Sequence, residues 1–220
     1  AILAANHNRS APASKTHTRR AAGSTLPTFK PMPDQMTTRD DALQRASRIK
    51  LMIFDVDGVL TDGALYFNHE GEEFKVFNSL DGHGMRMLRE SGVRLAIITG
   101  RKAPCVEWRM KNLRIDLLLQ GVDNKLAALK GLLEELGLTP EEAGFMGDDV
   151  IDLQVMDHCG FSAAPANAHA LAKQYARLVT ERTGGFGAAR EVCEFILEAQ
   201  GKLDAALAPY LPQSHSAAEK

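Results

Sequence analysis

Short, continuous apolar runs alternate with amphipathic segments through the middle of the chain. Continuous apolar runs are typical of parallel strands that are buried on both faces, and the intervening segments have helical periodicity. The pattern predicts strands at 50–54, 93–99, 115–120, 143–149, 160–165 and 177–180. It predicts helices at 81–92, 103–113, 124–137, 150–159, 169–176 and 185–201. We therefore expect an α/β fold, a Rossmann-like parallel sheet flanked by helices on both faces.

Residues 63–79 break this alternation and predict a β-hairpin that turns at Asn68–Gly71. For a two-stranded projection the segment is rich in apolar side chains, namely Leu65, Tyr66, Phe67, Phe74, Val76 and Phe77. Such a concentration of apolar side chains on a projection is typical of a contact surface, which makes the hairpin a candidate assembly element. The alternative is an ordinary surface hairpin.

Composition narrows the class of protein. The chain has 220 residues and a formal net charge of −2, which argues against a general nucleic-acid binder. No apolar run is long enough to span a membrane. The three cysteines lack metal-ligand spacing, so we expect reduced thiols in a cytoplasmic protein.

The two ends of the chain differ from its middle. Residues 1–38 are rich in Ala, Ser, Thr, Pro, Arg and His, which predicts a disordered extension, with an organellar targeting peptide as the alternative. The expected domain then covers 39–208, and 209–220 form a flexible tail.

Polar residues follow the predicted strands and carry the candidate chemistry. Asp55 and Asp57 follow the first strand, Thr99 ends the second, and Asp148 lies at the end of the fourth, while Lys125 opens a helix. The carboxyl ends of parallel strands meet at one edge of the sheet, so these side chains should share a pocket. Because several carboxylates at one place repel one another, we expect a hard divalent cation, Mg²⁺, among them.

The same residues suit phosphoryl transfer. Asp55 can attack phosphorus as a nucleophile, and Asp57 can protonate the leaving group and then deprotonate water. Thr99 would hold phosphate oxygens and Lys125 would offset negative charge. Asp149 and Asp152 either support the metal ligands through hydrogen bonds or simply start a helix.

Four segments together resemble the motifs of the haloacid dehalogenase superfamily. They are "DVDGVLTDG", "IITGR", Lys125 and "GDDVIDL", in that order along the chain. The resemblance implies a phosphatase or phosphomutase, because Asp57 occupies the position that other branches of the superfamily fill differently. Between Asp57 and Lys125 the sequence leaves no room for an inserted cap domain, so a neighbouring subunit would have to cover the pocket.

A longer stretch is similar to the capless phosphatases of 3-deoxy-D-manno-octulosonate (KDO) 8-phosphate. The matching segments are "FDVDGVLTDG", "FNSLDGHGMRML", "IITGR", "GVDNK", "GDDVIDLQVM" and "TGGFGAAREVCEFIL". The resemblance implies Mg²⁺-dependent hydrolysis of KDO 8-phosphate in lipopolysaccharide precursor synthesis. It also implies a homotetramer whose sites lie at subunit interfaces, with no nucleic-acid or membrane partner.

The same resemblance assigns roles to individual residues. The metal ligands would be Asp55, the backbone carbonyl of Asp57, and Asp148. The contacts to the sugar acid phosphate would be Asp57, Asn78, Ser79, Leu80, Asp81, Gly82, Arg86, Arg101, Arg109, Lys125 and Arg190. The glycine-rich segment before Arg190 is either a flexible turn or a backbone cradle placed over a neighbour's site.

Two other functions remain compatible with the sequence. One is a phosphatase for a nine-carbon sugar acid 9-phosphate of the KDN or neuraminate type, which would use the same catalytic residues. The other is a non-catalytic oligomerisation module, against which the presence of both Asp55 and Asp57 argues.

Overall fold

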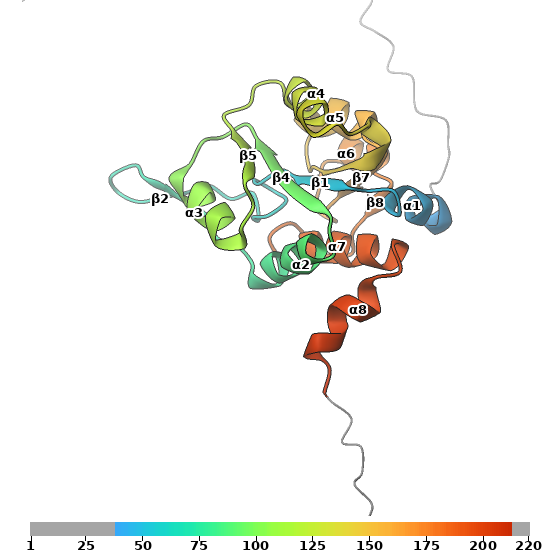
Figure 1. The fold of residues 1–220 in the computed structure, drawn as a ribbon. Helices are drawn as coiled ribbons and strands as arrows, with labels where there is room; N and C mark the ends of the chain where they lie inside the picture. Colours follow the sequence, from blue (N-terminus) through green and yellow to red (C-terminus); the bar gives the residue numbers. More distant parts are fainter. Residues whose placement is uncertain (1–37, 213–220) are drawn as a thin grey trace, which may run out of the picture. The chain divides into compact units, whose positions relative to one another are not determined.

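A six-stranded, all-parallel sheet forms the centre of the protein in a computed structural model that describes residues 38–212 (Figure 1). The strand order is β5-β4-β1-β6-β7-β8. The strands are β1 Leu51–Phe54, β4 Arg94–Thr99, β5 Leu117–Gln120, β6 Ala143–Met146, β7 Phe161–Ala164 and β8 Leu178–Val179. The predicted fold class is confirmed, and β1 lies in the middle of the sheet between β4 and β6.

Helices cover both faces of the sheet, as predicted. The helices are α1 Arg39–Ala46, α2 Ser79–Glu90, α3 Pro104–Leu113, α4 Lys125–Leu136, α5 Leu153–His158, α6 Ala170–Tyr175, α7 Ala188–Ala199 and α8 Leu203–Leu207. Short 3-10 turns occur at Pro140–Glu142, Val150–Asp152 and Ala208–Tyr210. Alternate side chains of β1 divide the core: Met52 and Phe54 pack with α1, α2, α3 and α7, whereas Leu51 and Ile53 pack with α4, α5 and α6. Figure 1 shows these two helical layers on opposite sides of the sheet.

Local caps set the ends of α2 and α7. Helix α2 begins at Ser79, before the predicted Asp81, because the Asn78 side chain accepts a hydrogen bond of 2.8 Å from the Leu80 N–H. Helix α7 begins only at Ala188, because Gly185 and Gly187 adopt φ values of 71° and 104°, which helices exclude.

Two elements near the ends of the domain were not predicted. Helix α1 buries only Ala42 and Ala46 and is otherwise polar, so it lacks a visible apolar stripe. Helix α8 buries no residue fully, although Leu203 and Leu207 pack against the core. The predicted extension lies outside the described residues except for Thr38, and so does the predicted tail from 213 onward.

The predicted hairpin is present and projects from the domain at the left of Figure 1. Its strands are β2 Tyr66–Phe67 and β3 Glu73–Phe74, paired antiparallel. The Asn68 side chain fixes the turn by accepting hydrogen bonds from the N–H groups of Glu70 and Glu72 at 3.0 and 2.9 Å. The hairpin and α2 occupy the chain between Asp57 and Thr99, where a cap domain would have been inserted.

Two further expectations concern the whole domain. Within residues 38–212, no helix combines the length and the apolar character that crossing a membrane requires. Cys105, Cys159 and Cys193 are all free thiols, with Cys193 fully buried.

Candidate active site

The carboxyl ends of β1, β4 and β6 meet at one pocket of about 210 Å³. Asp55 follows β1, Thr99 ends β4, and Asp148 follows β6 by one intervening glycine. The pocket lining is Asp55, Asp57, Gly58, Gly63, Thr99, Gly100, Arg101, Asp148, Asp149 and Ile151. The structure thus brings the predicted nucleophile, acid/base and hydroxyl together, because adjacent parallel strands end side by side.

Lys125 completes the predicted catalytic group through a contact with Asp55. The Asn124 side chain caps α4, so Lys125 is the first residue of this helix. The Lys125 side chain is buried. Its Nζ donates to Asp55 Oδ2 at 2.7 Å and to Asp152 Oδ1 at 2.6 Å. One cation therefore holds two carboxylates, and it fixes the orientation of Asp55.

Asp55, Asp148 and Asp152 form a crowded acidic cluster. Each offers one oxygen within 4.8 Å of the others'. Burial, with a further contribution from Asp152, raises the pKa of Asp55 to about 6, against the lowering effect of Lys125. Burial and the neighbouring Asp152 and Asp55 raise the pKa of Asp148 to about 7. The single positive charge of Lys125 cannot balance three carboxylates. The cluster, which is rich in oxygen atoms, therefore suits a hard divalent cation.

Two glycines, which have no side chain, leave the space that these carboxylates occupy. Gly58 has φ +82°, and a Cβ there would lie 2.0 Å from Asp148 Oδ2. A Cβ at Gly147 would lie 2.5 Å from the Cβ of Asp152. Both glycines therefore allow the acidic groups to approach the backbone closely.

The structure separates the roles of Asp149 and Asp152. Asp152 is fully buried, and its Oδ2 accepts hydrogen bonds from the N–H groups of Asp148 and Asp149 at 3.1 and 3.3 Å. It thereby links Lys125 to the loop that carries Asp148. Asp149 is exposed and accepts from the Val150 N–H at 2.7 Å, as a residue that starts a helical turn does.

Two residues of the hairpin reach this site and were not predicted. Lys75 donates to Asp57 Oδ1 and to Glu73 Oε1, the latter at 2.6 Å. Glu73 Oε2 accepts from Arg101 at 2.8 Å, and Arg101 Nε lies 3.9 Å from Asp57 Oδ2. The alternation of Glu73, Phe74, Lys75 and Val76 was the available signal, since it places both charges on one face of an extended strand.

Most of the predicted substrate contacts lie outside the pocket within one chain. Arg109 donates to the Asn78 carbonyl at 3.1 Å, and Gly82 makes room for its guanidinium. With Asp81 they line a separate, narrow hollow between α2 and α3. Ser79 and Leu80 are exposed at the start of α2. Only Asp57 and Arg101 of the predicted contacts line the pocket itself.

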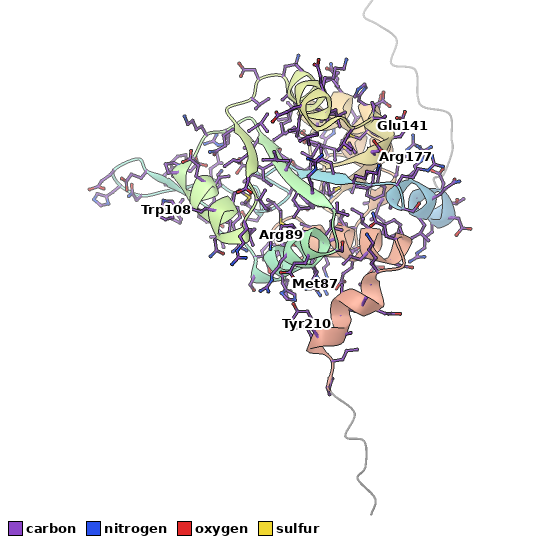
Figure 2. The ribbon with its side chains drawn as sticks, in the orientation of Figure 1. Met87, Arg89, Trp108, Glu141, Arg177 and Tyr210 are labelled. Atoms are coloured by element: carbon purple, nitrogen blue, oxygen red, sulfur yellow. The ribbon has the colours of Figure 1, made fainter. Side chains whose placement is uncertain are left out.

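The remaining predicted arginines pair along their own helices. Arg86 binds Glu90 at 2.8 Å and Arg190 binds Glu194 at 2.6 Å. The ring of His83 packs edge-on against Tyr210, with 4.8 Å between ring centroids. Tyr210, labelled in Figure 2, belongs to the C-terminal segment that follows α8. Contact of these arginines with substrate remains a prediction.

The glycine-rich segment before α7 packs on the loop that follows β1. The Gly185 N–H donates to the Val59 carbonyl at 3.0 Å. A Cβ on Gly184 would lie 1.8 Å from the Gly58 carbonyl oxygen, so only glycine fits. In this chain the segment supports the loop that contains Asp57 and Gly58.

Comparison with known proteins gives the family. A family model for haloacid dehalogenase-like hydrolases matches residues 108–190. The 3-deoxy-D-manno-octulosonate 8-phosphate phosphatase of Escherichia coli K12 is 51% identical over 166 residues, which cover 76% of this chain and 88% of that protein. The chain belongs to the KDO 8-phosphate phosphatase family. It is therefore a haloacid dehalogenase-like phosphatase.

Solved structures of phosphatases agree with this assignment. The Moraxella catarrhalis enzyme, solved in complex with magnesium, phosphate and KDO, is 42% identical with a TM-score of 0.77, over 78% of this chain and 99% of that one. A probable YrbI family phosphatase from Pseudomonas syringae is 51% identical with a TM-score of 0.78, over 79% of this chain and 99% of that one.

Proposed function

We propose that this protein hydrolyses KDO 8-phosphate to KDO and inorganic phosphate with Mg²⁺, through an aspartyl-phosphate, in lipopolysaccharide precursor synthesis. The observation that carries the proposal is the pocket in which Asp55, Asp57 and Asp148 meet, in a chain about half identical to phosphatases of that substrate.

Asp55, Asp148 and the backbone carbonyl of Asp57 would hold the magnesium ion. When bound, Mg²⁺ offsets the charge of the carboxylates and of the incoming phosphate. The raised pKa values of Asp55 and Asp148 support this ligand set, because burial and neighbouring carboxylates disfavour their charged forms and a bound cation would offset that effect. Asp152 would orient the site through Lys125 and through the backbone of the Asp148 loop.

The chain's own groups perform the two chemical steps. A carboxylate oxygen of Asp55 forms a bond to phosphorus as the bond to the sugar oxygen breaks, and Asp57 gives that oxygen a proton. Water then attacks the aspartyl-phosphate while Asp57 takes back a proton, which regenerates both carboxyl groups. Lys125 keeps Asp55 in place, and the Thr99 hydroxyl and the Arg101 guanidinium stabilise the phosphate oxygens.

The assembly we propose is a homotetramer in the cytoplasm, with neighbouring subunits closing the pocket. Two observations support it. Residues 38–212 form no cap domain over the pocket, and the hairpin exposes Leu65, Phe67, Phe74 and Val76 by 48–58%. Apolar side chains gathered on a projection are typical of a contact between subunits.

Phosphate release from three substrates tests the proposal. They are KDO 8-phosphate, a nine-carbon sugar acid 9-phosphate and glucose 6-phosphate, each with Mg²⁺ and with a chelator. We expect Mg²⁺-dependent release that is at least tenfold faster from KDO 8-phosphate. Comparable turnover of the nine-carbon ester would overturn the substrate assignment but keep the mechanism. No release from any of the three would favour the non-catalytic module.

A further inference from the structure

Lys75 is a buried cation of the hairpin that touches the acid/base group. Its side chain is only 2% exposed, although it lies on a projection whose neighbouring side chains face solvent. It donates to Asp57 Oδ1 and Glu73 Oε1, and Glu73 in turn accepts from Arg101. When both carboxyl groups are ionised, the two carboxylates and two cations have no net charge, so in that state the group is electrostatically balanced without a ligand.

The two oxygens of Asp57 have different surroundings. Oδ1 accepts from the Lys75 ammonium. Oδ2 is buried yet accepts no hydrogen bond within the described part of the chain, and Arg101 Nε approaches it only to 3.9 Å. A buried carboxylate oxygen normally has a hydrogen-bond partner, so the lack of one leaves Oδ2 as the Asp57 oxygen that is free to carry a proton.

We propose that Glu73 and Lys75 are positioning residues for phosphoryl transfer. Lys75 occupies Oδ1, which leaves Oδ2 as the oxygen that carries the transferable proton of Asp57. Glu73 holds Lys75 and Arg101 at once, so it places the acid/base group and the phosphate-binding arginine relative to each other. The proposal rests on the acid/base role of Asp57 that the proposed function assigns.

The chemistry involves one proton. It passes from Asp57 Oδ2 to the sugar oxygen as the phosphorus–oxygen bond breaks. The water that hydrolyses the aspartyl-phosphate returns it, so Asp57 ends each turnover as it began. Both steps need Asp57 in one orientation, and a rotated carboxyl group slows both.

A leaving group that needs no proton separates the two steps. Nitrophenolate leaves phosphorus without protonation, so with p-nitrophenyl phosphate only the second step depends on Asp57. In Lys75→Met we expect a burst of about one nitrophenolate per site, followed by a steady rate roughly 10- to 100-fold below that of the unaltered protein. With KDO 8-phosphate both steps slow down, and we expect a similar loss of kcat without a burst. Lys130→Met, an exposed lysine on α4, is the matched control and should behave like the unaltered protein.

Glu73→Gln separates positioning from general damage. It weakens the hold on Arg101 while Lys75 stays beside Asp57, so we expect KM for the sugar phosphate to rise at least threefold with a smaller change in kcat and no burst. If Lys75→Met unfolds, Lys75→Leu, which also removes the donor, replaces it in the burst experiment.

Two results would overturn the proposal: linear nitrophenolate release from a folded Lys75 variant, or an unchanged kcat. An error in the substrate assignment would give a different result. It would appear as an unaltered protein that is inactive on KDO 8-phosphate but active on p-nitrophenyl phosphate, and the burst comparison would still decide the role of Lys75.

Discussion

The carboxylate of Asp81 on α2 accepts a hydrogen bond of 2.9 Å from the backbone N–H of Arg190 on α7. A second bond, of 3.2 Å, comes from the Gly187 N–H. The side chain is 2% exposed, so Asp81 caps a helix that lies more than 100 residues further along the chain. Burial raises the pKa of Asp81, while the N–H donors oppose that rise.

Asp81→Asn should therefore lower the stability of the fold more than it changes the rate of phosphate release. The amide replaces one acceptor by a donor that faces a backbone N–H, and we expect the free energy of unfolding to fall by about 1–3 kcal/mol. Urea unfolding measures this, with the exposed Asp157→Asn as control. A raised KM at unchanged stability would show instead that Asp81 acts mainly on substrate.

Asp55→Asn should abolish turnover and leave the fold intact. The amide is no nucleophile toward phosphorus, so we expect phosphate release to fall by more than about 10⁴-fold, a loss of the scale seen when a catalytic group is removed. Thermal stability without metal should stay level or rise, because one of three crowded carboxylates disappears. The exposed Asp116→Asn serves as control, and sedimentation checks that assembly survives. Loss of assembly together with loss of activity would favour the alternative in which the protein is a non-catalytic oligomerisation module.

The pH dependence of stability should have an unusual sign in the metal-free protein. The folded-state pKa values of Asp55 and Asp148, about 6 and about 7, lie above the usual value of an unfolded aspartate. Their contribution to stability is thus present below pH 4 and is lost as pH rises through 6 to 7. We expect the Tm without metal to fall between pH 5 and 8, and added Mg²⁺ to raise the Tm more at pH 8 than at pH 5. An equal Mg²⁺ effect at both values would contradict this assignment.

Phe67→Ser should weaken assembly. Phe67 is 55% exposed on β2, and its burial between subunits would contribute about 1–2 kcal/mol for each chain. We expect sedimentation to show smaller species and specific activity to fall on dilution. Trp108 is 72% exposed on α3 (Figure 2), so Trp108→Ser removes an apolar group at least as large from an element other than the hairpin. Identical behaviour of the two variants would show that the hairpin is not the surface through which the subunits assemble.

Much of the architecture was predictable from local pattern. The continuous apolar runs agree with the strands observed, and the helix predicted at 124–137 agrees with α4, which Asn124 and Gly137 cap. Positions at strand ends also predicted the pocket, since parallel topology forces Asp55, Thr99 and Asp148 together. Prediction was weaker where tertiary contacts decide. Helix α1 has no apolar stripe, and Asp81 faces α7 through a contact that no local pattern encodes.

The hairpin charges illustrate the same limit. Alternation could have placed Glu73 and Lys75 on one face of β3 and its extension. It could not have shown that this face turns toward Asp57, because that depends on how the hairpin leaves the domain.

The contact between Gly184 and Gly58 ties the first catalytic loop to nearly the last part of the domain. During synthesis, β1 and Asp55 leave the ribosome early, but the sheet neighbour β6 and the glycine turn before α7 follow much later. The nascent chain should therefore acquire phosphatase geometry only when α7 docks. A chain truncated before residue 184 would keep every catalytic carboxylate and still lack the support that shapes the Asp57 loop.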